Sequence, residues 1–500
     1  MKRKFNKIIG SVLATFLLVF AIKVNAVTIT TDSSRVGITD TNSTYVTNQA
    51  TLTVTGIQVG DSFKAYKLLD TFYNSTSNTV TYEFTSSFKN YLLSIEAYND
   101  YTVDDYYKLT SGNITSGSTK TTSTLDKLVS GYVSYIKNNN VVGTDMTQNG
   151  NTISATLDAG AYLVLPVSTN KVYAVMVGNL DFEANGNDWV LNNESIVAKV
   201  SEAGVTKTVS DTSSKNLMQE EFTYTVVGTV PQYPTNAVNK TYKFVDTFDD
   251  SITFSGISSV VVKDGTTNLL VDTNGNVKDT SGNVVAIITV NGQVMTIDFN
   301  IDYVTSTTVT VSYKAKLNEQ VGYFNYNRVA LTYSNSPYTN DNMTTENINV
   351  NVKAYGIEIF KYAGSDKNKA LASAEFDIFA DSALTKKVGT IVTNGDGIGK
   401  LKGLGKGTYY IRETKAPAGY QVIKETIEVE VGSDDVAESR LTDNTLQYEV
   451  VEISNAATGI LPYTGGSGLL FYSIIGIVII GIGTIVTIKI HKKKALNVTE

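Results

Sequence analysis

The chain has 500 residues, no cysteine, a single histidine and a formal net charge of −7. Without cysteine it can form neither disulfides nor a thiol nucleophile, and its only imidazole, His491, lies close to the C-terminal end. The sequence therefore gives little support to a hydrolase or a metalloenzyme. The excess of acidic residues argues against nucleic acid or anionic lipid as a partner. Abundant Thr, Val, Tyr, Asn and Gly favour short strands and turns.

The N-terminal end has the features of a secretory signal peptide. Basic residues at positions 2–7 precede an apolar stretch over 8–22, and 24–26 form a small-residue cleavage site. We therefore expect residues 1–26 to be removed and the mature chain to begin at Val27. The protein is expected outside the cell.

The first domain is expected to span residues 27–200 and to be rich in strands, with short helical inserts. Apolar residues recur at helical spacing over 88–95 and again over 125–136, where Ser123 or Thr124 could cap the helix. After the signal peptide no lysine occurs before Lys64. The opening strand of this domain therefore offers no amine for the chemistry considered below, and we expect no internal bond of that type here.

The second domain is expected over residues 201–352, where apolar and polar residues alternate between Asn-Gly and Asp-Gly turn signals. Side chains of equal parity share a face of a strand. Lys207 thus shares a face with Val205 and Val209. Asp246 likewise lies on an apolar stripe. A further stripe contains both Asn325 and Asn327, and parity alone does not separate these two residues.

The third domain is expected over residues 353–458, as a compact set of short strands. Lys361, Glu413 and Asn455 each end an apolar stripe of a predicted strand. Isolated buried charges are costly, so the simplest arrangement brings the three side chains together. The alternative is that each residue is solvated at the rim of the sandwich, and parity does not decide between the two.

If the three residues meet, their burial leads to covalent chemistry. A desolvated lysine has a lowered pKa and can act as a neutral amine, and a desolvated carboxyl has a raised pKa and can act as an acid. The amine can then attack the Asn455 amide carbonyl while Glu413 moves the proton, which releases ammonia. The product would be a buried Lys–Asn isopeptide bond.

Two sequence motifs resemble those of known families of isopeptide-forming domains. Residues 413–420 read ETKAPAGY and closely resemble the E-box of the CnaB-type domains of Gram-positive surface proteins, and 374–376 read AEF as in that family. The resemblance implies that Lys361, Glu413 and Asn455 form an isopeptide bond. Residues 327–335 resemble the NxAxLxYSN strand of fimbrial isopeptide-forming domains, with Val329 in place of the alanine. Those domains use an acid in a Phe-x-Asp-Thr strand. This resemblance implies that the isopeptide-forming residues of the second domain are Lys207, Asp246 and Asn327.

A candidate acceptor lysine lies at the end of the first domain. The only tryptophan, Trp189, is followed ten residues later by Lys199. This segment is similar to the WxxxVxVYPK motif of backbone pilins, although Val197 and Ala198 replace Tyr-Pro and the spacing is one residue longer. The resemblance implies that Lys199 accepts the neighbouring subunit during polymerisation.

The C-terminal end carries a sorting signal. An apolar run over 468–488 is long enough to span a bilayer, and the basic residues behind it favour a cytoplasmic end. The pentapeptide before it resembles the LPXTG motif that sortases cut between Thr and Gly, and it consists of Leu461, Pro462, Tyr463, Thr464 and Gly465. Removing both ends takes away nine basic residues and one acidic residue, so the mature charge is 32 − 47 = −15.

An aspartate-rich segment over 272–279 could hold calcium, but it lacks a closing glutamate and is better explained as a hairpin turn. We therefore expect neither a metal nor a cofactor.

Together these features resemble the SpaA-type backbone pilins of sortase-assembled Gram-positive pili. The resemblance implies an all-β protein of tandem immunoglobulin-like sandwiches of the CnaA and CnaB types, stacked end to end. It implies a structural subunit and no enzyme, apart from the autocatalytic bonds. The implied partners are a sortase, identical subunits, ancillary tip and base pilins, and peptidoglycan. The alternative is a singly anchored adhesin that binds a host ligand.

Overall fold

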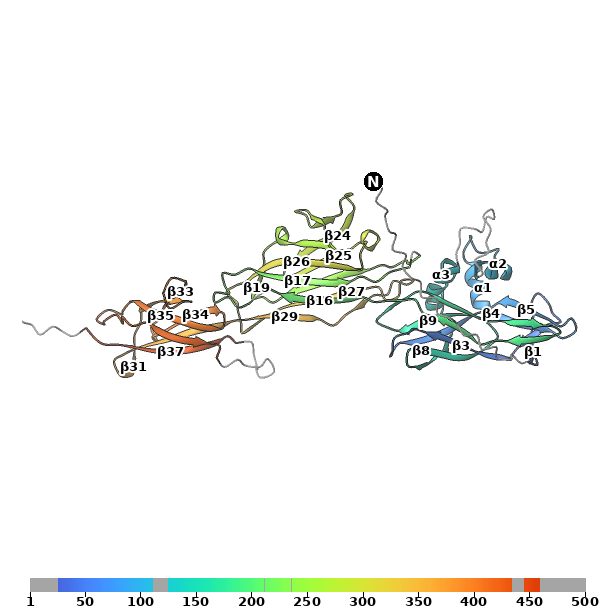
Figure 1. Ribbon diagram of the computed structural model, residues 1–500, viewed down its shortest axis with the longest axis horizontal. Helices are drawn as coiled ribbons and strands as arrows, with labels where there is room; N and C mark the ends of the chain where they lie inside the picture. The colour runs from blue at the N-terminus through green and yellow to red at the C-terminus, as the bar shows by residue number, and fades with distance from the viewer. Residues whose placement is uncertain (1–25, 111–124, 211, 235, 434–444, 459–500) are drawn as a thin grey trace, which may run out of the picture.

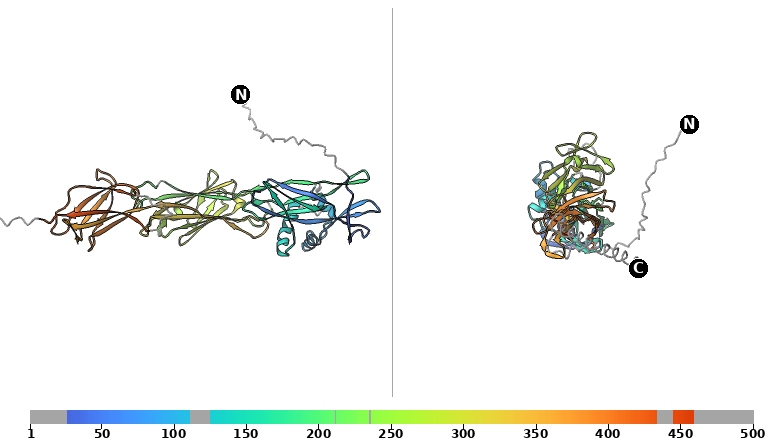
Figure 2. Two further views of the ribbon diagram at one scale, coloured as in Figure 1. Left: turned by 90° about the horizontal axis from the view of Figure 1, so that it is seen from below. Right: turned by 90° about the vertical axis from the view of Figure 1, so that its left-hand side faces the viewer.

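The computed structural model describes residues 26–110, 125–210, 212–234, 236–433 and 445–458. Three β-sandwich units follow one another along the long axis of the molecule (Figures 1 and 2). The expected all-β fold of tandem sandwiches is confirmed. The signal peptide, the sorting motif and the apolar run over 468–488 lie outside the described residues. Within those residues no helix is long and apolar enough to cross a membrane.

The first unit contains two main sheets. The larger sheet consists of β1 (Thr31–Val36), β2 (Thr44–Val46), β4 (Ser62–Asn74), β9 (Gly160–Ser168) and β11 (Met176–Leu180), with β5 (Thr79–Phe84) and β6 (Thr144–Asp145) also paired with β4. The second sheet consists of β14 (Glu194–Val197), β3 (Gln49–Thr55), β8 (Thr152–Asp158) and β7 (Thr147–Asn149). Two short ribbons pair β10 (Val172–Tyr173) with β15 (Val200–Ser201) and β12 (Phe182–Asn185) with β13 (Asp188–Leu191).

Three helices pack on one side of the first unit: α1 (Ser86–Leu93), α2 (Val103–Thr110) and α3 (Leu125–Asn138) (Figure 1). The periodic segment over 125–136 therefore lies in a helix, and the segment over 88–95 is helical as far as Leu93, while α2 was not anticipated. The expected caps Ser123 and Thr124 lie outside the described residues. Phe88 and Tyr132 are fully buried and pack with Leu68 of β4 in one apolar cluster. This cluster fixes the helices on the outer face of the larger sheet.

The second unit is the largest sandwich. One sheet consists of β16 (Gly204–Val209), β17 (Phe222–Thr229), β26 (Thr308–Leu317), β20 (Val261–Asp264) and β21 (Thr267–Asn268), with β19 (Ile252–Phe254) on β26. The other consists of β22 (Leu270–Val271), β23 (Asn276–Lys278), β24 (Val284–Asn291), β25 (Val294–Phe299), β18 (Tyr242–Phe248), β27 (Phe324–Tyr333) and β28 (Met343–Thr344), with β29 (Ile348–Lys353) on β27. Two short 3-10 helices lie at Ile257–Ser259 and Ile301–Tyr303.

The segment considered for calcium is a hairpin turn, since β22 pairs antiparallel with β23 across it. The Asp272 carboxylate accepts the backbone N–H groups of Asn274 and Asn276. Gly275 has a φ of +84°, and a Cβ there would lie 2.2 Å from the Ile288 carbonyl oxygen, so only glycine fits. Among the described residues no group of three or more acidic or histidine side chains is arranged to hold a metal.

The third unit consists of two four-stranded sheets. One contains β31 (Asp366–Ala370), β30 (Tyr355–Ala363), β34 (Ile398–Leu404) and β37 (Gln447–Asn455), and the other contains β33 (Lys387–Val392), β32 (Glu375–Phe379), β35 (Gly407–Lys415) and β36 (Ile427–Val431). The last strand, β37, runs parallel to the first, β30. This pairing puts the first and last strands side by side, with the chain entering and leaving the unit at opposite ends of the strands.

At both junctions, residues of the second unit pack into the core of the neighbouring unit. Tyr338, in the loop after β27, is 4% exposed and packs in the helix-side core of the first unit. Its carbonyl accepts a hydrogen bond from Ser134 of α3 at 2.7 Å. At the other end, Tyr323 and Phe324 pack in the core of the third unit. Because the second unit contributes core residues to both neighbours, the three units form a continuous rod.

Candidate functional site: two buried lysine, acid and asparagine trios

The second unit brings Lys207, Asp246 and Asn327 into direct contact. They come from β16 in one sheet and from β18 and β27 in the other, so the site lies between the sheets. The Lys207 amine lies 2.5 Å from Asp246 Oδ2 and 2.8 Å from Asn327 Oδ1. The exposed fractions are 5% for the lysine and 0% for the other two. The amine and the amide carbonyl are thus adjacent in a site closed to water.

Burial moves the protonation of this pair in the direction that the chemistry requires. Desolvation lowers the pKa of Lys207 to about 8, although Asp246 beside it acts in the opposite sense. Desolvation also raises the pKa of Asp246 against the opposing effect of Lys207. Asp246 Oδ1 has no hydrogen-bond partner among the described residues. Relative to the same groups in water, both shifts favour the neutral amine and the protonated carboxyl.

The structure separates the two asparagines that parity left open. Asn325 is also fully buried, but its amide is held by backbone groups of Gly322 and Val352. Asn327 is the one that contacts Lys207. Tyr313 of β26 also enters the site, because its hydroxyl lies 2.8 Å from the Lys207 amine and 2.7 Å from Asn327 Nδ2. This tyrosine belongs to none of the motifs found in the sequence.

The third unit brings together Lys361, Glu413 and Asn455, which come from β30, β35 and β37. The Lys361 amine hydrogen-bonds to Asn455 Oδ1 and lies 3.3 Å from Glu413 Oε1. Asn455 Nδ2 in turn donates to Glu413 Oε1 at 2.9 Å. None of the three is more than 4% exposed. The side chains therefore meet in the core, and the alternative of three solvated rim residues is wrong.

Burial and one backbone contact shape this second site. Desolvation lowers the pKa of Lys361 to about 8, with Glu413 acting in the opposite sense. Glu413 Oε2 accepts the backbone N–H of Ile423 at 2.7 Å, which fixes the carboxyl group and leaves Oε1 for the two nitrogen atoms. The Lys361 amine also lies 5.3 Å from the centre of the Phe376 ring. The site thus holds an amine of lowered basicity against an amide carbonyl.

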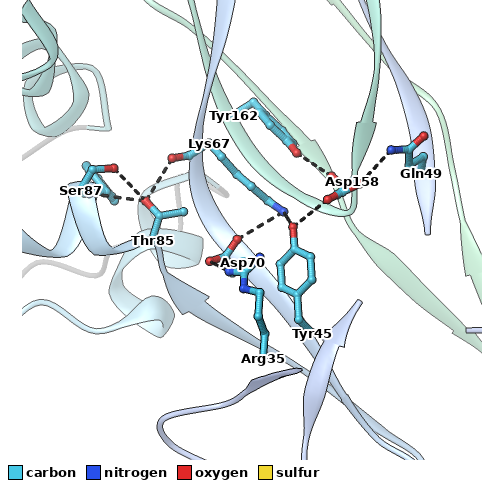
Figure 3. Close-up of polar contacts among 10 residues, drawn as sticks. Arg35, Tyr45, Gln49, Lys67, Asp70, Thr85, Ser87, Asp158 and Tyr162 are labelled. Atoms are coloured by element: carbon cyan, nitrogen blue, oxygen red, sulfur yellow. Dashed lines mark hydrogen bonds and ion pairs between the residues drawn. The ribbon is translucent and has the colours of Figure 1, made fainter. Parts of the chain in front are cut away.

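The first unit contains a different polar cluster, shown in Figure 3. The Lys67 amine donates to the Tyr45 hydroxyl at 2.7 Å and lies 3.4 Å from Asp70, while Tyr45 donates to Asp158 at 2.8 Å. Arg35 covers the Tyr45 ring at 3.6 Å. Lys67 lies beyond the opening strand, where no sequence pattern indicated a lysine site. The Lys67 amine contacts a phenol and a carboxylate, whereas the lysine amine of each trio contacts the side-chain amide of an asparagine.

Lys199 lies between β14 and β15, where the first unit ends. Its side chain is exposed, and its carbonyl accepts the backbone N–H of Ala174 at 3.0 Å. A cavity of about 300 Å³ adjoins it, lined by Val172, Tyr233 and other residues of the junction. Lys171, a nearby alternative, is paired with Glu202 at 2.7 Å and is only 16% exposed in its side chain. Lys199 is thus the more accessible amine.

Comparison with known proteins agrees with this architecture. The family described as the SpaA prealbumin-like fold domain matches residues 356–445, which contain Lys361 and Glu413. The trypsin-resistant surface T6 protein of Streptococcus pyogenes serotype M6 is 28% identical over 289 residues, covering 53% of this chain and 52% of that protein. The chain therefore aligns with about half the length of this curated relative.

Two solved structures share the fold over most of the chain. The T6 backbone pilin of serotype M6 Streptococcus pyogenes superposes with a TM-score of 0.62 at 20% identity, covering 77% of this chain and 80% of that one. The full-length major pilin SpaD of Corynebacterium diphtheriae gives 0.54 at 20% identity, covering 82% and 98%. The expected resemblance to backbone pilins of Gram-positive pili is therefore confirmed.

Proposed function

We propose that the chain is the backbone subunit of a covalently polymerised pilus on the Gram-positive cell wall. The observation that carries the proposal is the pair of buried trios, each with a lysine amine held against an asparagine carbonyl beside a carboxyl group. The fold shared with backbone pilins supports it. The function is mechanical, and the chain turns over no external substrate.

Each trio forms one isopeptide bond when its unit folds. The neutral lysine amine attacks the asparagine Cγ, the carboxyl group passes a proton from the amine to the leaving nitrogen, and ammonia departs. The bonds join Lys207 to Asn327 and Lys361 to Asn455. Because each product is a neutral amide, it removes the cost of a buried charge and closes a long loop of the chain.

A sortase joins the subunits to one another. It cleaves after Thr464 within the motif at 461–465 and transfers the threonine carbonyl to the Lys199 amine of another copy. An exposed lysine is largely protonated near neutral pH, so the sortase supplies the base that frees the amine. The last subunit, or a base pilin, is transferred to peptidoglycan instead, and an ancillary pilin occupies the tip. The exposed position of Lys199 supports this assignment.

The test is the size of the wall-bound protein in the native bacterium. Denaturing gels of wall extracts should show a ladder of polymers, and Lys199→Arg should reduce it to monomer because the guanidinium is not a nucleophile at this pH. Lys171→Arg is the matched control and should leave the ladder intact. A ladder that survives Lys199→Arg moves the acceptor elsewhere. The absence of any ladder in the wild type favours the singly anchored adhesin.

A further inference from the structure

The two trios differ in how the acid reaches the nitrogen atom that must leave. In the third unit a single oxygen, Glu413 Oε1, lies 3.3 Å from the Lys361 amine and accepts from Asn455 Nδ2 at 2.9 Å. One carboxyl oxygen therefore contacts both nitrogen atoms between which the proton has to move. A direct transfer through Glu413 is possible there.

In the second unit the acid is an aspartic acid, which is one methylene group shorter. Asp246 Oδ2 reaches the Lys207 amine at 2.5 Å, but Asn327 Nδ2 donates instead to the Tyr313 hydroxyl at 2.7 Å. That hydroxyl donates to Asp246 Oδ2 at 2.8 Å. The phenol thus occupies the gap between the shorter carboxyl group and the leaving nitrogen.

We propose that Tyr313 is a catalytic residue of the second isopeptide reaction and relays a proton from Asp246 to the amide nitrogen of Asn327. The proposal rests on the isopeptide chemistry proposed above. As the bond from Lys207 Nζ to Asn327 Cγ forms, protonated Asp246 gives its proton to the phenol oxygen, and the phenol gives its own proton to Nδ2. The amine then gives one proton to the Asp246 carboxylate. The bond from Cγ to Nδ2 then breaks, ammonia leaves, and Asp246 and Tyr313 are restored.

The surroundings of Tyr313 suit this role. The residue is fully buried, and its ring stacks on Tyr224 at 5.7 Å and meets the edge of Phe248 at 5.7 Å, so the hydroxyl is held in one place. Burial raises the pKa of Tyr313 well above 10, and Asp246 adds to that shift. The phenol therefore keeps its proton between transfers. In the third unit the ring near the lysine is Phe376, which has no hydroxyl, and there the longer Glu413 needs no relay.

The test compares two tyrosines of the same core in the mature chain, residues 27–464. Tyr313→Phe removes the relay, and Tyr224→Phe is the matched control because the Tyr224 hydroxyl has no partner among the described residues. Intact mass and peptide mapping follow ammonia loss at each unit over time. Tyr313→Phe should slow the Lys207 to Asn327 bond by roughly a hundredfold or more, while the third-unit bond forms normally. Tyr224→Phe should form both bonds at the wild-type rate.

A rescue variant separates a chemical role from a structural one. Adding Asp246→Glu to Tyr313→Phe lengthens the acid into the space that the hydroxyl vacates, as in the third unit, and should restore the second-unit bond. A folded Tyr313→Phe protein that forms this bond at the wild-type rate overturns the relay, as does a double variant that stays unbonded. If the wild-type protein loses no ammonia from Asn327, the proposed isopeptide function itself is overturned. The two failures are therefore distinguishable.

Discussion

The third-unit bond should account for much of the stability of that unit, and Lys361→Met tests this directly. Methionine nearly matches the length and volume of the lysine stem, so the core stays filled while the amine is lost. Glu413 and Asn455 still hydrogen-bond to each other. The substitution therefore removes the crosslink with little additional damage to the packing.

The magnitude follows from the loop that the bond closes. From residue 361 to residue 455 the loop spans 455 − 361 = 94 residues. By the chain-entropy relation used for disulfides, opening such a loop costs about 4.7 kcal/mol at 25 °C. This loss is close to the lower end of the whole stability of a typical domain, and the melting temperature should fall by about 20 °C or more.

The assay is calorimetry combined with trypsin digestion of the mature chain. The third unit of Lys361→Met should melt first and be cut, while the second unit stays intact because its bond is independent. Lys400→Met is the control, since Lys400 forms a half-exposed surface pair with Glu358 and should cost less than about 1 kcal/mol. If mass spectrometry finds the bond in the wild type and Lys361→Met still melts within about 5 °C of it, the loop-closure reasoning is wrong.

Three further features can each be tested on their own. The Asn327→Ala protein should lose only one ammonia molecule, whereas the Asn325→Ala protein should still lose two. The reverse result would reassign the bonded asparagine. Tyr338→Ala should destabilise the first unit and its junction by about 3–5 kcal/mol, because a buried aromatic is lost; unchanged melting and small-angle scattering would contradict the continuous rod. Burial raises the pKa of Glu83, but hydrogen bonds from Thr39 and Ile38 outweigh it and leave the pKa lowered. Stability from Glu83 is thus complete above its unfolded pKa and lost as pH falls through the lower folded value. The protection factor of the Ile38 amide, which corrects for slower intrinsic exchange in acid, should therefore fall at acid pH, and a protection factor unaffected by Glu83→Gln would refute this.

The sequence predicted the two trios better than their surroundings. Alternation along single strands placed Lys361, Glu413 and Asn455 on core faces, because the position of a side chain on a strand is a local property. Tyr313 could not be found in that way. It is one of many buried aromatic residues, and only the pairing of β17 with β26 and the packing of the two sheets set its hydroxyl beside Lys207.

Contacts between distant segments could not be predicted from the sequence either. The cluster around Lys67 depends on β2 and β9 flanking β4, which no local pattern specifies. Tyr338 lies in a loop of the second unit, and nothing in its neighbourhood indicates that it enters the core of the first. The choice between Asn325 and Asn327 needed the side-chain contacts, because the two residues have the same parity and are both fully buried.

The intact mass of recombinant protein spanning residues 27–464 tests the central claim most directly. The account predicts a mass lower than the sequence value by two ammonia molecules, with peptide mapping that joins Lys207 to Asn327 and Lys361 to Asn455. Asp246→Ala and Glu413→Ala should each restore one ammonia. A mass equal to that of the unmodified sequence would contradict the proposal that the buried trios form covalent bonds.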